Sequence, residues 1–267
     1  MKIKSDLFKK SFLISLIVFA IISAIIMTNL YFESMIVDPA ERKSNVLIGL
    51  THNGDLISVA LLHCNPKNNS ITSLAIPDNT MLSNGNILQN LYSSGKPSAL
   101  IDTIEDLTGA KVNRYLFITM DSLISLTDGV DKFEYLIRHP FVFNGNEYSG
   151  NVYMTGELAK AMFTYRHYDA SKVSMADMGE TFLYNFISTQ SNSNNMEAVK
   201  SALIVNKSKL NLKTNLTDDE INAYCDFFAN FSSITQNTVK LDGETMSSST
   251  NTYFVPSNNK ATKNIFK

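Results

Sequence analysis

The chain has 267 residues, of which 44% are hydrophobic and 18% are charged, so it is long enough to bury the core of one large or two small domains. Its 23 Lys and Arg against 25 Asp and Glu give a net charge of −2, whereas a nucleic-acid-binding protein is normally basic. The two cysteines, Cys64 and Cys225, lack CxxC spacing. This excludes a disulfide-rich scaffold and a Cys-based zinc site, and leaves open whether the two thiols meet.

The N-terminal region has the pattern of a membrane anchor. Residues 11–32 are 22 consecutive uncharged residues, which as a helix would span roughly 33 Å, enough to cross a bilayer. Four lysines in residues 1–10 predict that this end is cytoplasmic and that the remainder lies outside. A cleaved signal peptide is the alternative, but the run is long and no small-residue cleavage site follows it. We expect an uncleaved anchor, a linker over 33–44 and an extracytoplasmic domain over 45–267.

Three short apolar runs open the expected domain. They cover residues 45–50, 56–64 and 71–77, and turn signals separate them, including Asn53-Gly54. Apolar runs joined by short turns are typical of neighbouring antiparallel strands. The sequence therefore predicts an antiparallel meander over residues 45–77.

The remainder of the chain is mainly helical in pattern. Thr217, followed three residues later by Glu220, is a capping-box signal for a helix that starts there. The stretch 141–154, rich in Gly, Asn and aromatic residues, receives no assignment. Helices are predicted near 86–94, 97–109, 120–129, 156–167, 175–190, 195–208 and 214–231, and strands near 112–119, 238–241 and 251–256. The predicted fold class is α/β, with a mixed sheet covered by helices.

Generic catalytic motifs are absent from the sequence, which has no GxSxG, HExxH, Walker or GxGxxG pattern. His63 falls inside an apolar run and is interpreted as a partnered core histidine. Asp55 follows a turn and is interpreted as a turn-stabilising residue. The pair Arg166-His167 closes a predicted helix, where capping and ligand contact are equally good interpretations.

The order of segments is more informative. NVLIGL, then ISVALLHCNPKNNSITSLAIPDNT, then LTGAKVNRYLFI, then GELAKAMFTYRH, and finally TNLTDDEI resembles the LytR-CpsA-Psr (LCP) family of cell-envelope proteins. The resemblance runs from about residue 45 to about residue 256, and an anchor followed by an outside domain also fits that family. The pattern is carried most specifically by NPK…LAIPxxT, LTGAKVNRYLFI and TNLT.

The resemblance implies a particular chemistry. LCP proteins resemble phosphotransferases that take a glycopolymer from a polyprenyl-pyrophosphate carrier and attach it to peptidoglycan. The implied fold is an α/β sandwich with a hydrophobic groove for the lipid tail. In the family, several arginines bind the pyrophosphate, because each guanidinium group can donate two hydrogen bonds to phosphate oxygens. Acidic residues with Mg²⁺ assist by neutralising the charge that develops in transfer.

The departures from the family pattern fall on this polar site. The family has an Asp-Thr pair in a strand, an Arg-Asp pair in IPRDT, an Arg-x-Arg motif, and two Arg and a Gln in the next helix. The residues at these positions here are Ile57 and Ser58; Asp78 and Asn79; Thr164 and Arg166; and Met175, Met178 and Gly179. Only Arg166 keeps its charge among the matched arginines.

The arginine count leads to the same conclusion. The whole chain has four, at positions 42, 114, 138 and 166, so a multi-arginine clamp cannot be assembled at the matched positions. Asp78 would repel a phosphate oxygen about 4 Å away by roughly 4 kcal/mol at an effective dielectric near 20. A metal ion held by Asp55, Asp78 and Asp169 could lie between the carboxylate and the phosphate and remove this repulsion. We nevertheless predict no metal site, and Mg²⁺ is expected only if the protein is an active enzyme.

Three hypotheses follow. The first is an envelope-assembly protein with impaired or lost phosphotransferase activity, which still binds a polyprenyl-phosphate lipid, a glycopolymer or a partner, and not nucleic acid. The second is an active Mg²⁺-dependent transferase with a rebuilt site, and the third is an interaction module without a ligand groove. Arg166 is the candidate catalytic residue. The candidate binding residues are Asp55, Asp78, Asn79, His167, Met175 and Met178.

Overall fold

The computed structural model describes residues 43–92, 97–168, 173–209, 212–247, 252–257 and 266. The expected anchor over 11–32, the tail before it and nearly all of the linker lie outside these residues. Within the described part of the chain, no helix is long and apolar enough to cross a membrane. The chain divides into two compact units, residues 1–37 and 38–267, and the second contains all the described elements.

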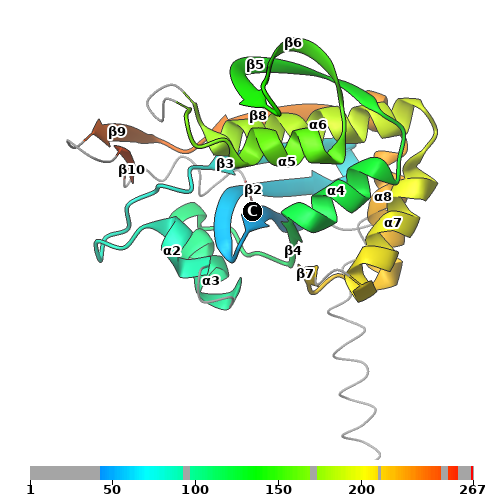
Figure 1. Cartoon of the computed structure of the whole chain (residues 1–267). Coiled ribbons are helices and arrows are strands. Elements are labelled where there is room, and N and C mark those ends of the chain that lie inside the picture. The colour runs from blue at the N-terminus through cyan, green and yellow to red at the C-terminus, as the bar shows by residue number, and fades with distance from the viewer. Residues whose placement is uncertain are drawn as a thin grey trace, which may run out of the picture. The chain divides into compact units, whose positions relative to one another are not determined.

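A six-stranded mixed sheet forms the centre of this unit, in the order β7-β4-β1-β2-β3-β8 (Figure 1). The predicted meander is confirmed, since β1 pairs antiparallel with β2 and β2 antiparallel with β3. Parallel pairing adds β4 beside β1 and β8 beside β3. The strand bounds are β1 Ser44–His52, β2 Asp55–Asn65, β3 Ser70–Ile76, β4 Arg114–Thr119, β7 Lys213–Thr214 and β8 Thr235–Lys240.

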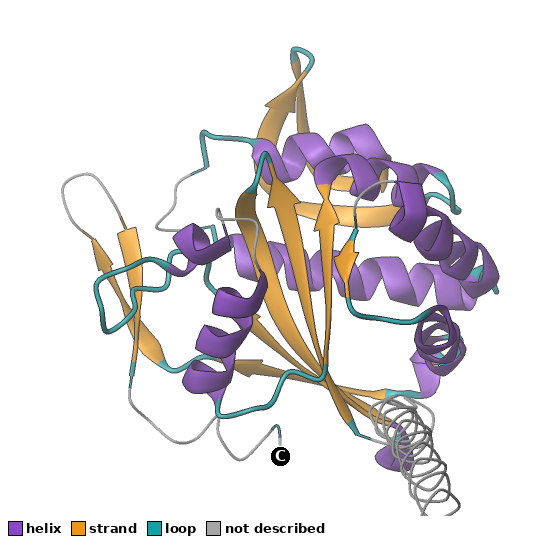
Figure 2. Cartoon of the chain, turned by 90° about the horizontal axis from the view of Figure 1, so that it is seen from below, coloured by secondary structure: helices purple, strands orange, loops and turns teal. Residues whose placement is uncertain are grey.

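Helices cover both faces of the sheet (Figure 2). The short α2 and α3 pack on one face, whereas α4 and α6 contact the strands from the other, with α5, α7 and α8 packed beside them. The predicted capping box is confirmed, because the Thr217 hydroxyl accepts from the Glu220 N–H and the Glu220 carboxylate accepts from the Thr217 N–H. The helix bounds are α2 Leu88–Tyr92, α3 Pro97–Thr108, α4 Met120–Asp128, α5 Gly156–Thr164, α6 Met175–Asn192, α7 Met196–Lys209 and α8 Asp218–Phe228.

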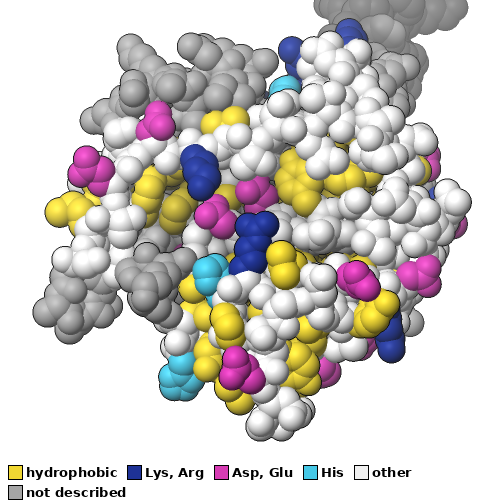
Figure 3. Space-filling model, turned by 90° about the horizontal axis from the view of Figure 1, so that it is seen from above, with side chains coloured by type: hydrophobic (Ala, Val, Ile, Leu, Met, Phe, Trp, Pro, Cys, Tyr) yellow, Lys and Arg dark blue, Asp and Glu magenta, His cyan; other side chains and the backbone are white. Residues whose placement is uncertain are grey.

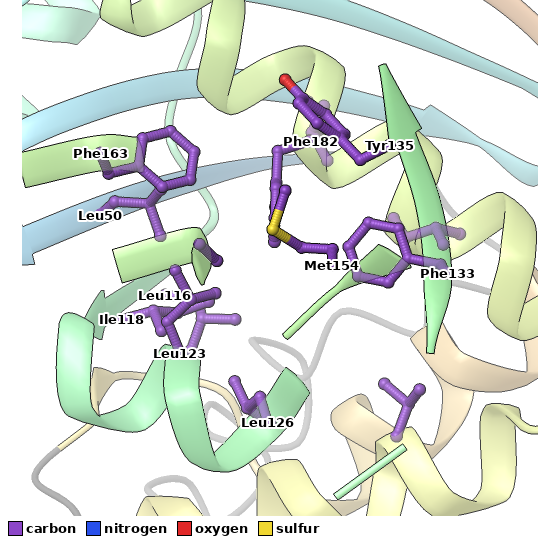
Figure 4. Packing of buried hydrophobic residues seen from close by; sticks show 14 of the residues in the cluster. Leu50, Leu116, Ile118, Leu123, Leu126, Phe133, Tyr135, Met154, Phe163 and Phe182 are labelled. Carbon is purple, nitrogen blue, oxygen red and sulfur yellow. The ribbon is translucent and has the colours of Figure 1, made fainter. Parts of the chain in front are cut away.

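Strand alternation divides the buried residues into two cores. On β1, Val46 and Leu50 face the large core under α4 to α8, whereas Leu47 faces the smaller core under α2 and α3. Successive side chains of a strand point to opposite faces, so an uninterrupted apolar strand fills both cores at once. Figure 4 shows part of the large core, where Leu116, Ile118 and Leu123 lie close together.

The stretch 141–154, which the sequence left unassigned, belongs to a β-hairpin that begins at residue 133. It consists of β5 (Phe133–Phe143) and β6 (Asn146–Met154), which form a separate two-stranded sheet above α5 and α6 (Figure 1). Its two-residue turn, Asn144-Gly145, has φ values of 49° and 78°, the left-handed conformation that tight hairpin turns require. A second small sheet pairs β9 (Gly243–Ser247) with β10 (Thr252–Pro256).

Candidate functional site

An apolar cavity of about 140 Å³ lies between the sheet and α4, α6, α7 and α8. Its walls are almost entirely hydrocarbon, and none of the described residues that line it is a Lys, Arg, Asp or Glu. The lining residues are Val46, Ile48, Leu50, Ser58, Ala60, Leu62, Cys64, Leu116, Ile118, Leu123, Leu126, Gly179, Phe182, Leu183, Phe186, Ile187, Met196, Val199, Leu203, Leu216, Ile221, Tyr224, Cys225 and Phe228. Such a space suits a hydrocarbon chain and not a charged ligand.

The cavity runs along β1 and β2. Its lining begins on β2 at Ser58 and ends at Cys64, six residue steps that span roughly 20 Å in an extended strand. Gly179 of α6 lies against Ser58 at the first end, so closely that a Cβ there would collide with the serine. At the other end the Tyr224 hydroxyl donates to Ser44 Oγ at 2.8 Å, so the phenol that Tyr224 contributes to the cavity lining has a hydrogen-bond partner.

A polar pocket of about 170 Å³ lies beside this cavity, between β5 and the first turns of α6. Arg138 and His139 line it from the hairpin, and Asp177 and Met178 line it from the helix. A ring contact separates the two spaces, because Tyr135 of the polar pocket and Phe182 of the apolar cavity have centroids 5.8 Å apart. On the face shown in Figure 3, charged and histidine side chains lie together near the middle, next to hydrophobic ones.

Arg166 and His167 lie in a third place, an open groove of about 630 Å³ along α5 and the end of β5. Both side chains are exposed, and the groove shares no lining residue with the apolar cavity. The structure therefore brings the two predicted site residues together. It separates them from the wall of the cavity and from Arg138.

Asp55, Asp78 and Asn79 lie at the same end of two interior strands of the central sheet, where β2 begins and just after β3 ends. Asp55 is exposed and pairs in register with His52 across the β1–β2 turn. The Asn79 amide donates to the Thr252 carbonyl at 2.9 Å, so it fastens β10 to the loop after β3. Burial raises the pKa of Asp78 to about 6. Hydrogen bonds from the backbone N–H groups of Asp78 and Asn79 partly oppose this rise, because they stabilise the charged carboxylate.

The two methionines of the predicted site separate as well. Met178 is buried and lines the polar pocket beside Arg138, whereas Met175 is half-buried and packs against the large core. Neither lines the apolar cavity. Arg138, the cationic side chain opposite the first turns of α6, belongs to β5, a strand that the sequence analysis did not predict.

The Mg²⁺ that the family resemblance implies does not fit the residues described. Within them, no three His, Cys, Asp or Glu side chains are grouped so as to hold a metal ion, and Asp169 lies outside the described residues. The Asn79 side-chain amide donates to the Thr252 carbonyl on β10. No step of a mechanism is therefore assigned to a metal.

One further feature was not found by sequence reasoning. Glu180 is a buried carboxyl on α6 that accepts a hydrogen bond from Ser73 of β3, and burial raises its pKa. Cys64 and Cys225 are both free and both line the cavity, where burial raises the pKa of each thiol to about 12. The sequence left open whether Cys64 and Cys225 form a disulfide. In the structure they do not, and their raised pKa values make both thiols unreactive.

The fold and the cavity together define an α/β protein with an apolar cavity between its sheet and its helices. Comparison with known sequences gives this class a family, because the sequence model of the LytR_cpsA_psr family matches residues 37–266. The chain belongs to the LytR-CpsA-Psr family, as the segment order predicted.

Similar proteins carry transferase names. A Bacillus mycoides protein named polyisoprenyl-teichoic acid–peptidoglycan teichoic acid transferase TagU is 24% identical over 238 residues, which cover 84% of this chain and 77% of that protein. A TagU of Halalkalibacterium halodurans is 29% identical over 129 residues, 45% of this chain and 42% of the relative. The matched segment thus spans less than half of that second relative.

Solved structures confirm the mixed α/β fold. Bacillus subtilis TagV has a TM-score of 0.71 at 18% identity, covering 85% of this chain and 96% of TagV. TagT bound to LI-WTA has a TM-score of 0.65 at 15% identity, covering 85% of this chain and 89% of TagT. At these identities the likeness establishes the fold alone.

Proposed function

We propose that this chain is a membrane-anchored, extracytoplasmic LCP protein that binds a polyprenyl-linked envelope glycopolymer and has little or no phosphotransferase activity. The observation that carries the proposal is the contrast between the cavity and its surroundings. In the part of the chain that the structure describes, no charged side chain lines the apolar space, and Arg138 and Arg166 lie in two other pockets.

The lipid part of the proposal depends on the cavity. A polyprenyl tail gains about 25 cal/mol for each Å² of apolar surface removed from water, and the lining offers hydrocarbon on every side. The TagU relatives are named for a polyisoprenyl-linked substrate, which supports the same ligand class here. The third hypothesis, an interaction module with a closed core, loses support because the cavity exists.

The proposed loss of phosphotransferase activity is supported by the positions of two arginines, which line different pockets. A diphosphate needs several convergent cations in one place, yet Arg138 lines the polar pocket and Arg166 lines the open groove. Asp78 stands where the family has an arginine, and its carboxylate would repel a phosphate. Arg166 remains the only matched candidate for any residual catalysis.

The experiment uses the full chain in lipid nanodiscs with a synthetic polyprenyl-pyrophosphate glycolipid, Mg²⁺ and a peptidoglycan acceptor. We expect the glycolipid to bind, as seen by native mass spectrometry, and the transferred product to stay at background. Bacillus mycoides TagU is the side-by-side comparison. Robust turnover that Arg166→Ala abolishes would contradict the proposed loss of activity, and absence of lipid binding would contradict the proposed ligand.

One observation favours the second candidate, an active transferase with a rebuilt site. Arg138 and His139 reach the first turns of α6 from β5, where the family would supply arginines from the helix itself. Turnover that depends on a divalent metal and falls on Arg138→Ala and on Asp78→Ala would establish this alternative. Turnover unaffected by either substitution would reject it.

A further inference from the structure

The β5–β6 hairpin has one face that packs on the helices below it and one face that is open (Figure 1). On β5, Phe133, Tyr135 and Ile137 are buried in the large core, and the residues between them are exposed. The same alternation continues on β6, which ends at the buried Met154. Because successive side chains of a strand point to opposite faces, the exposed residues of the two strands form a single outer face.

This outer face contains most of the exposed hydrophobic surface of the domain. Five large hydrophobic side chains of the described residues are exposed, and three of them, Leu136, Val142 and Tyr153, belong to the hairpin. Tyr153 is the register partner of Glu134, and Leu136 is that of Asn151, so the Tyr153 ring and the Leu136 side chain are diagonal neighbours. Exposed apolar side chains gathered on one face are typical of an interaction site.

The charges nearest to Leu136 have opposite signs on its two sides. Glu134 lies two residues before it and Arg138 two residues after it, each roughly 7 Å away along the strand. Both side chains are exposed, although Arg138 also borders the polar pocket. Neither forms an ion pair with another residue that the structure describes. Because roughly 13 Å of strand separates them, they do not pair with each other.

A second pair of charges repeats this order farther from Leu136. Lys132 lies four residues before Leu136, just ahead of β5. In the other direction, Glu147 lies four residues along β6 from Asn151, the register partner of Leu136. Both side chains are exposed. A two-fold rotation through Leu136 therefore exchanges every negative position of the outer face with a positive one.

We propose that this outer face packs on the same face of a second copy of the chain, with Leu136 at the two-fold axis and the two β5 strands antiparallel. Arg138 of one copy then lies against the partner's Glu134 and the partner's Tyr153. A guanidinium group can pair with the carboxylate and stack on the neighbouring ring at the same time. The two-fold axis repeats every contact, so each dimer contains this arrangement twice.

The charge order favours this arrangement over the alternatives. A parallel packing of the two β5 strands would place Glu134 opposite the partner's Glu134, and like charges in an interface repel. A lipid surface would leave the same four charged groups without partners in a medium of low polarity. The nine-residue strand β6 makes a face about 30 Å long and about 10 Å wide, less than the ~800 Å² per partner of a standard interface, so we expect a dissociation constant in the micromolar range.

The test measures the oligomeric state of the full chain in detergent micelles by sedimentation velocity over a concentration series. We expect a monomer–dimer equilibrium that Glu134→Arg weakens at least about tenfold, because it places like charges opposite each other. The double variant Glu134→Arg/Arg138→Glu restores the opposite charges and should return to within about threefold of the wild type. Glu244→Arg, on an exposed residue of β9, makes the same change of charge elsewhere and should leave the dimer unchanged.

Cross-linking tests the position of the axis. A cysteine at the axis meets its own copy, so Leu136→Cys should form a covalent dimer with a short bifunctional maleimide. The native Cys64 and Cys225 are buried and should not react. Val205→Cys on α7, where the wild-type side chain is exposed to nearly the same extent as that of Leu136, is the matched control and should stay monomeric. Circular dichroism establishes that each variant is folded.

Three outcomes overturn the proposal. A protein that stays monomeric at every concentration has no such interface. A dimer that Glu134→Arg leaves intact, or that Val205→Cys captures as well as Leu136→Cys does, uses another surface. Slow maleimide labelling of Leu136→Cys in a monomer would show that detergent or lipid covers the face instead. None of these measurements involves a polyprenyl lipid or a glycopolymer, so their failure leaves the proposed function untouched.

Discussion

A Cβ atom placed on Gly179 would lie 2.1 Å from Ser58 Oγ and 2.9 Å from Ser58 Cβ. These residues occupy two matched positions of the family's polar site, one on β2 and one on α6. Rotation of the serine hydroxyl would relieve the first clash but not the second. The two elements therefore approach so closely that a side chain at position 179 requires α6 to move, and the polar site cannot be restored by a single substitution there.

Gly179→Ala should destabilise the protein by about 1–2 kcal/mol. Alanine would gain roughly 1 kcal/mol of helix propensity. Overpacking costs ~1–3 kcal/mol, and a contact of 2.1 Å places this site in the upper part of that range, at about 2–3 kcal/mol. Urea unfolding measures the difference. In a Ser58→Gly background the same substitution should become neutral or stabilising, because the clashing atoms are gone. A Gly179→Ala protein as stable as the wild type would show that α6 has room to shift.

The raised pKa of Asp78 predicts a pH-dependent stability. Its pKa rises from 3.8 to about 6 on folding, so the folded state favours the protonated carboxyl. Stability from this group is therefore present below pH ~4 and is lost as the pH rises through about 6, by at most ~3 kcal/mol. Asp78→Asn should remove this loss and be more stable than the wild type at pH 8. The exposed Asp55→Asn serves as control and should follow the wild-type curve of unfolding free energy against pH.

Filling the apolar cavity should block lipid binding without unfolding the protein. Ala60 lines the cavity from the middle of β2, so Ala60→Phe would place a ring in the space that we assign to the tail, at a packing cost of ~1–3 kcal/mol. The shift in melting temperature caused by polyprenyl phosphate should disappear. Ala202→Leu on α7, which does not line the cavity, should retain it. An undiminished shift in Ala60→Phe would place the lipid elsewhere.

Arg114 and Glu220 form a buried ion pair that joins β4 to α8. Arg114 Nε donates to Glu220 Oε1 at 2.7 Å, and the Glu220 side chain is 1% exposed. Removing one partner leaves a buried charge uncompensated, so Arg114→Met should cost ~3–5 kcal/mol in unfolding free energy. The double variant Arg114→Met/Glu220→Gln should recover part of this, because no bare charge remains. A cost below 1 kcal/mol for the single variant would show that water reaches Glu220.

The central strands and most helices were predictable because their signals are local. The capping box of α8 and the three apolar runs of β1 to β3 each fall within one short segment. The β5–β6 hairpin was missed although Asn144-Gly145 is a strong turn signal. Its β5 strand alternates buried and exposed residues, and the unassigned stretch began at residue 141, within that strand, so the alternation was not seen.

The candidate site was less predictable because it is assembled from distant segments. The apolar cavity draws on β1, β2, β4 and four helices, and no local pattern distinguishes its lining from ordinary core. Arg138 could be counted in the sequence but not positioned, since its place opposite α6 depends on the missed hairpin. Conversely, the position matches placed Met178 and Arg166 in one site, whereas the structure divides them between two pockets.

The start of β1 is held from both faces of the sheet. Ser44 accepts from Tyr224, and the Asn45 amide group donates to the carbonyls of Lys111 and Phe266, while β2 and β4 flank the strand along its length. If the preceding segment is fixed in a membrane and the domain is attached to a rigid wall, mechanical load enters here, in the middle of the sheet. Two rows of hydrogen bonds would then have to shear together instead of peeling one by one, so the domain would resist a pull along the tether.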